Sequence, residues 1–278
     1  MTAASPGRRN RAAIGIFCDQ SFQSLTKTSP SPPGISLELV QGCWICDRKK
    51  ADSLDQSPPG RSGTEMIKIL VTGFGAFPGV PSNPSSALLS ALKKRRRRLQ
   101  RFGIALELRE LPVTYAGLPQ RLARLAKEIR PDAILQFGVA SGREVISVEK
   151  FARNHVDTRH PDASGKPAFK DVLVAHGPRA LKTRIPDSEI VAALRRAGIP
   201  SAMSNDAGDY VCNASFYHAL RLANVRCVGF IHIPFPRARR GARKDKRPHF
   251  EDIVRAAEIA LIIIARALRP NAALRYAG

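Results

Sequence analysis

The chain has 278 residues, of which 44% are hydrophobic, and this length and composition suit one large α/β domain or two small ones rather than a disordered chain. No apolar run reaches the length of a transmembrane helix, because the longest candidate, at 257–268, is short and flanked by charges. Five thinly spread cysteines do not make a disulfide framework. With no convincing signal peptide, we expect a cytoplasmic protein that does not bind membranes.

The formal net charge of +22 is large enough to raise the question of a nucleic-acid partner. Thirteen of the 45 basic residues lie in two runs, at 93–98 and 237–247. Neither run contains the interleaved aromatic residues on which bases would stack. We therefore expect solvated positive charge, and a nucleic-acid or anion-binding protein remains the alternative from another class.

Residues 1–65 differ in composition from the rest of the chain. They are rich in Ser, Pro and Gly and show no sustained hydrophobic period of 2 or 3.6. A CxxC at 43–46 has no second ligand pair, so we predict no metal site there. We predict that residues 1–65 are a disordered extension, or lie upstream of the true start codon, and that residues 66–278 form a single α/β domain.

From Met66 onward, strand patterns alternate with helix patterns. The run "IKILVTG" is β-branched and ends in Gly, as is typical of a central strand, whereas the helical segments carry an apolar stripe. This alternation predicts a three-layer α/β/α sandwich with a central, largely parallel (mixed) twisted sheet. The predicted strands are 67–73, 104–113, 131–138, 144–154, 199–204 and 225–236, and the predicted helices are 84–98, 116–130, 187–198, 209–223 and 249–268.

Cys212 lies in "SNDAGDYVCNASFYHAL", at the point where a polar, Gly-containing loop turns into a helical pattern. A thiol at a helix N-terminus feels the positive end of the helix dipole, and this predicts a lowered pKa and a nucleophile. The alternative is a small hydrophobic residue in the core.

A cysteine nucleophile needs a base and a group that orients the base. His232 lies near the carboxyl end of the buried strand "GFIHIPFP", where sites form in α/β sheets. Glu149 lies in the apolar stretch "ISVEKF", where a solitary acid is costly unless it has a partner. The alternatives are a packed core histidine and a glutamate that pairs with a nearby arginine.

The chain resembles the pyroglutamyl peptidase I family of cysteine peptidases, the pyrrolidone-carboxylate peptidases, over nearly all of residues 66–268. The resemblance rests on four ordered blocks: "ILVTGFGAFPGVPSNPS", "ILQFGVASGREVISVEKFARNHVDTRHPDASG", "LRRAGIPSAMSNDAGDYVCNASFY" and "VGFIHIPFP". It implies a hydrolase that removes an N-terminal L-pyroglutamyl residue from peptides, with Cys212 as the nucleophile, His232 as the base and Glu149 as the orienting acid.

The same resemblance implies further site residues. Arg159 matches the family arginine associated with stabilising the oxyanion, and the Cys212 amide would be a second donor. The pyroglutamyl ring is small, flat and uncharged, and five residues match the family positions around it: Phe74, Phe77, Asn83, Tyr210 and Val211. The resemblance also implies no metal or organic cofactor, and a homo-oligomer, either a dimer or a tetramer.

The chain departs from the family pattern at two pocket positions. Gly75 stands where an acidic residue is usual, and His160 stands where an aliphatic residue follows the arginine. The segment from Cys212 to His232 is also shorter than in many members. These departures leave open a second enzymatic interpretation, a hydrolase of the same fold with altered acyl specificity.

Overall fold

The computed structural model describes residues 66–237 and 245–269. The predicted extension at 1–65, with its CxxC, and most of the second basic run lie outside the described residues. Within the described ranges, no helix is both long enough and apolar enough to cross a membrane.

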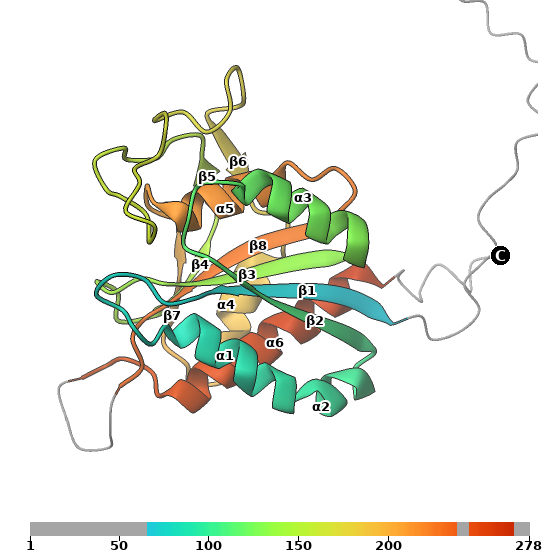
Figure 1. Cartoon of the computed structure of the whole chain (residues 1–278). Helices are drawn as coiled ribbons and strands as arrows, with labels where there is room; N and C mark the ends of the chain where they lie inside the picture. Colours follow the sequence, from blue (N-terminus) through green and yellow to red (C-terminus); the bar gives the residue numbers. More distant parts are fainter. Residues whose placement is uncertain (1–65, 238–244, 270–278) are drawn as a thin grey trace, which may run out of the picture. The chain divides into compact units, whose positions relative to one another are not determined.

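A six-stranded sheet forms the centre of the described domain, in the order β2-β1-β3-β8-β4-β7 (Figure 1). Neighbouring strands run parallel except for β4 and β8, which pair antiparallel. The predicted α/β fold with a largely parallel, mixed sheet is confirmed. The strands are β1 (Ile67–Phe74), β2 (Ile104–Leu111), β3 (Ala133–Val139), β4 (Ile146–Glu149), β7 (Ser201–Ser204) and β8 (Cys227–Ile233).

The central strands β1, β3 and β8 are buried along almost their whole length, whereas β2, at the edge, has exposed positions. A strand buried on both faces requires a helical layer on each side, which explains why these strands read as near-continuous apolar runs rather than alternating ones. Their β-branched residues suit such a pleated, enclosed surface.

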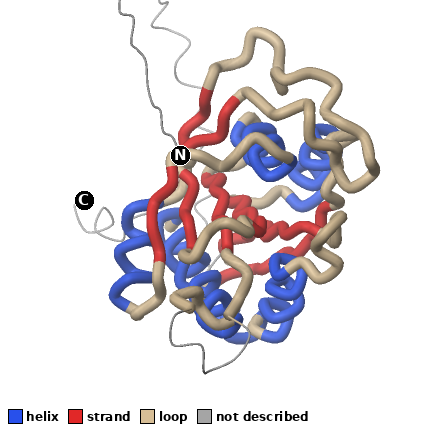
Figure 2. Tube along the Cα trace, turned by 90° about the vertical axis from the view of Figure 1, so that its left-hand side faces the viewer, coloured by secondary structure: helices blue, strands red, loops and turns tan. Residues whose placement is uncertain are grey.

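Helices cover both faces of the sheet, as the two views show (Figures 1 and 2). Apolar residues of α1, α2, α4 and α6 pack on one face in a single cluster. Those of α3 and α5 pack on the other face, in a second cluster against which the partly buried Cys212 packs. The helices are α1 (Pro84–Lys94), α2 (Arg96–Arg101), α3 (Leu118–Ile129), α4 (Asp187–Arg196), α5 (Val211–Leu220) and α6 (Phe250–Leu268).

The helix predicted at 84–98 is wrong as a single element, because the chain breaks at Arg95 between α1 and α2. The break allows Leu99 to be fully buried while Arg95 pairs with Glu251 of α6. Arg98 approaches the buried Glu258 of α6, with 3.6 Å between Nε and Oε1. Part of the first basic run therefore serves contacts within the fold.

The strand predicted at 144–154 is also wrong as a single element. Only β4 belongs to the central sheet, whereas β5 (Phe151–Arg153) pairs antiparallel with β6 (Ala180–Lys182) in a separate two-stranded sheet. The amide of Lys150 donates to the Ser204 carbonyl at 2.7 Å, and the chain then leaves the central sheet. Glu149 is therefore the last residue of β4.

Candidate active site

Cys212 is the second residue of α5, as the sequence pattern predicts. Tyr210 occupies the N-cap position and offers no side-chain acceptor to the first amides of the helix. The loop before it is ordered by local hydrogen bonds, in which the Gly208 amide donates to the Asp206 carboxylate at 3.0 Å. The first amides of a helix are the natural donors to an anion at this end.

The sulfur of Cys212 faces strand β3 at Gly138. A Cβ atom at position 138 would lie 2.8 Å from the Cys212 Sγ and 2.8 Å from the Phe230 ring, so only glycine leaves room for both. Gly138 is the register partner of His232 in the parallel pair β3–β8, and register partners project from the same face of a sheet. The Cys212 sulfur and the His232 side chain therefore lie on the same face of the sheet, at neighbouring strand positions.

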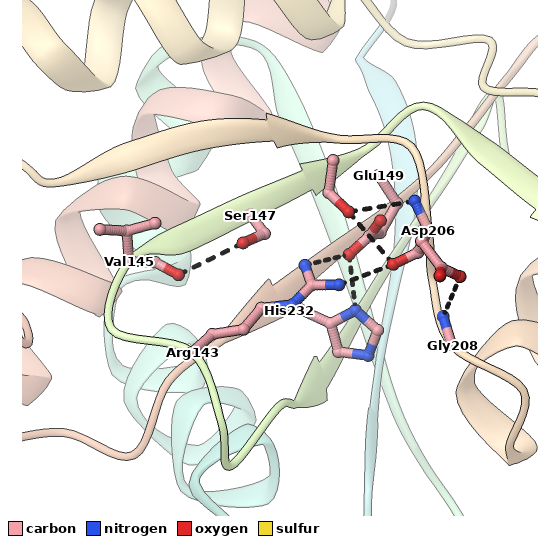
Figure 3. A network of polar contacts seen from close by, with 8 residues as sticks. Arg143, Val145, Ser147, Glu149, Asp206, Gly208 and His232 are labelled. Carbon is pink, nitrogen blue, oxygen red and sulfur yellow. Dashed lines mark hydrogen bonds and ion pairs between the residues drawn. The ribbon is translucent and has the colours of Figure 1, made fainter. Parts of the chain in front are cut away.

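Glu149 and His232 come together through the antiparallel pair β4–β8. Ser147 is opposite His232 and Glu149 is opposite Phe230, so the two functional side chains are diagonal neighbours on one face. The His232 Nδ1 lies 2.8 Å from the Glu149 Oε1, and both side chains are buried (Figure 3). Because a carboxylate only accepts, the hydrogen bond puts the proton on Nδ1 and leaves Nε2 as the free base.

Arg143, in the turn between β3 and β4, is a member of this network that the sequence reasoning did not single out. Its Nη1 donates to the Glu149 Oε1 at 2.5 Å, and its Nη2 donates to the Asp206 carbonyl at 2.6 Å (Figure 3). Glu149 therefore has both of the partners considered from the sequence, a histidine and a nearby arginine. No periodicity reveals Arg143, because it reaches the site from a loop.

Burial controls the protonation of the cysteine and the histidine. Burial raises the pKa of the Cys212 thiol to about 12, the Glu149 charge adds to this rise, and Arg143 and the Cys212 amide oppose it. Burial also lowers the pKa of His232, in spite of its bond to Glu149. The predicted lowering of the cysteine pKa is wrong, because desolvation outweighs the helix terminus. The resting pair is a neutral thiol and a neutral imidazole.

Arg159 does not contact Cys212 in the described structure. Its side chain is 84% exposed and pairs with Asp157, with Nη2 donating to Oδ2 at 2.6 Å. The Asp157 amide donates to the Asp209 carbonyl at 2.8 Å, which brings this loop against the segment that leads into α5. His160 points outward, 67% exposed, with its Nε2 3.6 Å from the Asp157 Oδ2.

The two predicted pocket phenylalanines lie at different depths. Phe74 is buried, and its ring centroid lies 6.4 Å from that of Phe230, which in turn lies 4.7 Å from the His232 ring. Phe77 is half-buried in a turn closed by a bridge to Val80. Phe74 therefore acts as a core residue beneath the site, and Phe77 lies nearer the surface.

Tyr210 and Val211 directly precede the nucleophile. Val211 is fully buried in the core. Tyr210 packs edge-on against Tyr115 at 5.9 Å, and its hydroxyl donates to the Pro161 carbonyl at 3.0 Å. Tyr115, which the sequence reasoning missed, has a buried hydroxyl with no hydrogen-bond partner among the described residues.

Asn83 caps helix α1 rather than standing free. Its Oδ1 accepts from the Ser85 amide at 3.0 Å, and its Nδ2 donates to the Gly75 carbonyl at 2.9 Å. It thereby holds the turn between Phe74 and Phe77 in place. At Gly75, a Cβ atom would lie 2.9 Å from a Glu110 carboxylate oxygen, so an acid from β2 stands beside the position where the family acid is missing.

Known proteins share both the sequence and this architecture. A family model described as pyroglutamyl peptidase matches residues 67–267. The pyrrolidone-carboxylate peptidase of Thermococcus kodakarensis is 37% identical over 202 residues, covering 71% of this chain and 96% of that protein. The relative from Thermococcus onnurineus is 36% identical over 199 residues, covering 70% of this chain and 97% of that protein.

Solved structures agree with these sequence matches. The pyrrolidone carboxyl peptidase of Thermus thermophilus superimposes with a TM-score of 0.63 at 37% identity, covering 70% of this chain and 99% of that one. The pyroglutamyl peptidase I of Bacillus amyloliquefaciens gives 0.64 at 29% identity, covering 72% and 97%. The family match covers every strand of the described sheet, as well as the cysteine at the helix N-terminus and the histidine–glutamate pair. This chain therefore belongs to the pyroglutamyl peptidase family.

Proposed function

We propose that this chain removes an N-terminal L-pyroglutamyl residue from peptides, with Cys212 as nucleophile, His232 as general base and acid, and Glu149 as the group that orients the imidazole. The observation that carries the proposal is the 2.8 Å bond between His232 Nδ1 and Glu149 Oε1, on the sheet face to which Cys212 points. A nucleophile, a base and an orienting acid are the minimum set for acyl transfer.

In the first half of the reaction, the His232 Nε2 removes the thiol proton as the Cys212 sulfur attacks the carbonyl carbon that joins the pyroglutamyl group to the next residue. The resting thiol is neutral, so proton transfer accompanies attack rather than preceding it. The resulting oxyanion accepts from the Cys212 amide at the start of α5. His232 then donates its proton to the leaving amine, and a thioester to Cys212 remains.

In the second half, His232 removes a proton from water, which attacks the thioester carbonyl. The carbon–sulfur bond breaks, free pyroglutamate leaves, and the proton returns to the Cys212 sulfur. Glu149 keeps His232 protonated at Nδ1 in both halves of the reaction. The other tautomer would carry its proton on Nε2, and Nε2 could then not accept the proton of the thiol or of water. A thiol nucleophile must stay reduced, in keeping with the cytoplasmic location that we propose.

We also propose Arg159 as the second oxyanion donor, in a substrate-bound arrangement in which it leaves Asp157. Phe77 and Tyr210 are the proposed pocket walls nearest the surface, and Phe74, Asn83 and Val211 support them from beneath. The interpretation as a hydrolase of altered acyl specificity loses support from one observation, which is that a Glu110 carboxylate lies beside Gly75.

The test is release of a fluorescent amine from an L-pyroglutamyl amide. Wild-type protein should turn over the substrate, and Cys212→Ala and Cys212→Ser should reduce kcat by at least about 10⁴-fold. Cys227 is the other cysteine within the described ranges, and it lies at the start of β8 away from the site. Cys227→Ser is therefore the matched control and should keep wild-type activity. Full activity in Cys212→Ala would refute the proposal.

A further inference from the structure

One guanidinium group connects two parts of the site that are distant in sequence. The two terminal nitrogens of Arg143 donate to different acceptors, Nη1 to the Glu149 Oε1 at 2.5 Å and Nη2 to the Asp206 carbonyl at 2.6 Å (Figure 3). The Arg143 side chain is 27% exposed, whereas the Glu149 side chain is completely buried. The planar fork of arginine can hold two acceptors at a set angle, which a lysine cannot do.

The first acceptor is the acid of the proposed triad. A buried carboxylate is stable only with charged or hydrogen-bonding partners, and the neutral His232 supplies a hydrogen bond but no charge. Glu149 Oε2 has no partner among the described residues, so Oε1 alone carries both contacts. Without Arg143, nothing in this network would compensate the Glu149 charge or prevent the carboxylate from turning away from His232.

The second acceptor lies in the loop that leads to the nucleophile. Asp206 precedes Cys212 by six residues, and its carbonyl also accepts from the Ser204 hydroxyl at 3.1 Å. Its carboxylate accepts from the Gly208 amide, which shapes the turn into α5. The same guanidinium therefore joins the end of strand β4 to the entry of the nucleophile helix.

The positive charge of Arg143 also reaches the reacting groups. For Cys212, burial and the Glu149 charge raise the pKa, and Arg143 lowers it. For His232, burial lowers the pKa, Glu149 raises it, and Arg143 lowers it. A cation beside the pair favours the thiolate and the neutral imidazole, which are the forms that attack and that accept the proton.

We propose that Arg143 is a positioning residue of the triad, which clamps the Glu149 carboxylate to the loop before Cys212 and so sets the geometry of acid, base and nucleophile together. This inference rests on the function proposed above, since it assigns a role within that reaction. Arg143 touches neither the sulfur nor the imidazole and acts through Glu149 and Asp206.

The first experiment compares Arg143→Met, Arg143→Lys and Arg153→Met on the L-pyroglutamyl amide. Arg153 is a matched control, because its guanidinium also pairs with Asp206, at 3.4 Å on an exposed surface, but does not touch Glu149. Misplacing a reacting group by about 1 Å can cost on the order of 100-fold in rate. We expect Arg143→Met to lower kcat by about 10- to 100-fold with KM changed by less than about threefold. Arg153→Met should keep wild-type kinetics.

The second experiment measures the pH dependence of Cys212 alkylation by iodoacetamide, read by mass spectrometry of the peptide that contains Cys212. Removing a positive charge raises the pKa of every neighbouring group, so Arg143→Met should be alkylated more slowly than wild type at each pH below the thiol pKa, which displaces its alkylation curve to higher pH. Arg143→Lys should keep the wild-type curve, because it keeps the charge, but should still lose kcat. This readout needs no peptidase activity, so a wild-type protein that fails to cleave the amide would refute the proposed function without deciding this one.

Two results would overturn the inference. One is Arg143→Met with kcat within about twofold of wild type. The other is a lowered kcat with an unchanged alkylation curve, which would mean disturbed packing alone. If circular dichroism shows Arg143→Met to be unfolded, Arg143→Lys decides: a loss of about tenfold or more in kcat at an unchanged alkylation curve supports the clamp, and wild-type kcat refutes it.

Discussion

The sulfur of Cys212 lies 2.8 Å from the point where a Cβ atom at Gly138 would begin. Strand β3 thus approaches the nucleophile by its bare backbone, and the absence of one side chain makes room for the sulfur beside His232. The glycine at position 138 is therefore required for the geometry of the site.

Gly138→Ala is therefore expected to displace the Cys212 sulfur or the Phe230 ring, because a contact of 2.8 Å is too short for carbon against sulfur. We predict a fall of at least about tenfold in kcat/KM and a stability cost of about 1–3 kcal/mol. Steady-state kinetics and urea unfolding measure the two effects. Gly142→Ala is the matched control in the next turn, since nothing lies within 4 Å of a Cβ atom there. Wild-type kinetics in Gly138→Ala would contradict the prediction.

Arg159 offers a test of the second oxyanion donor. If it leaves Asp157 when substrate binds, Arg159→Met should lower kcat by about 10²- to 10³-fold with little change in KM, because oxyanion contacts form only in the transition state. Asp157→Asn weakens the competing pair of the resting structure and should leave kcat at or above that of wild type. A normal kcat in Arg159→Met would refute the role in oxyanion binding, and the pair with Asp157 would then be the only interaction assigned to Arg159.

The dependence of activity on pH follows from the buried histidine. Burial lowers the pKa of His232 below its usual value of about 6.5, so the base stays neutral and active until the pH falls below that value. We predict that the acid limb of kcat/KM lies below pH 6.5, and that Glu149→Gln moves it to still lower pH. Removing a negative charge lowers the histidine pKa, so a downward shift is the expected sign. An acid limb well above pH 6.5 in the wild type would show that the imidazole is not desolvated in solution.

Variants of Asn83 test whether this residue affects substrate binding through the structure of the neighbouring turn. Asn83→Ala removes the cap of α1 and should cost about 1 kcal/mol of stability, together with a higher KM because the turn carrying Phe77 loosens. Asn83→Asp keeps the acceptor for Ser85 but loses the donor to Gly75, and should retain most of the stability while sharing the higher KM. Thermal unfolding and KM for the L-pyroglutamyl amide give the two readouts. An unchanged KM in both variants would show that the Asn83 contacts do not affect substrate binding.

Much of the fold was predictable from the sequence because it follows from local chemistry. Apolar periodicity and turn residues located nearly every helix and strand, and the polar loop before Cys212 marked the start of α5. The four ordered blocks indicated the family, which the comparisons confirm. The pairing of Glu149 with either a histidine or an arginine was also foreseeable, since a lone buried acid needs a partner.

The tertiary structure decided the features that depend on contacts between distant segments. The split of 144–154 into β4 and β5 depends on which residues pair with β7 and β8 and which pair with β6, and the break at Arg95 accompanies contacts of Arg95 and Arg98 with Glu251 and Glu258 of α6. Local patterns carry no record of such contacts. The raised pKa of Cys212 has the same origin. The residues next to Cys212 in the sequence predict the helix terminus, whereas the desolvation that raises the pKa comes from burial against segments distant in sequence, among them β3 at Gly138.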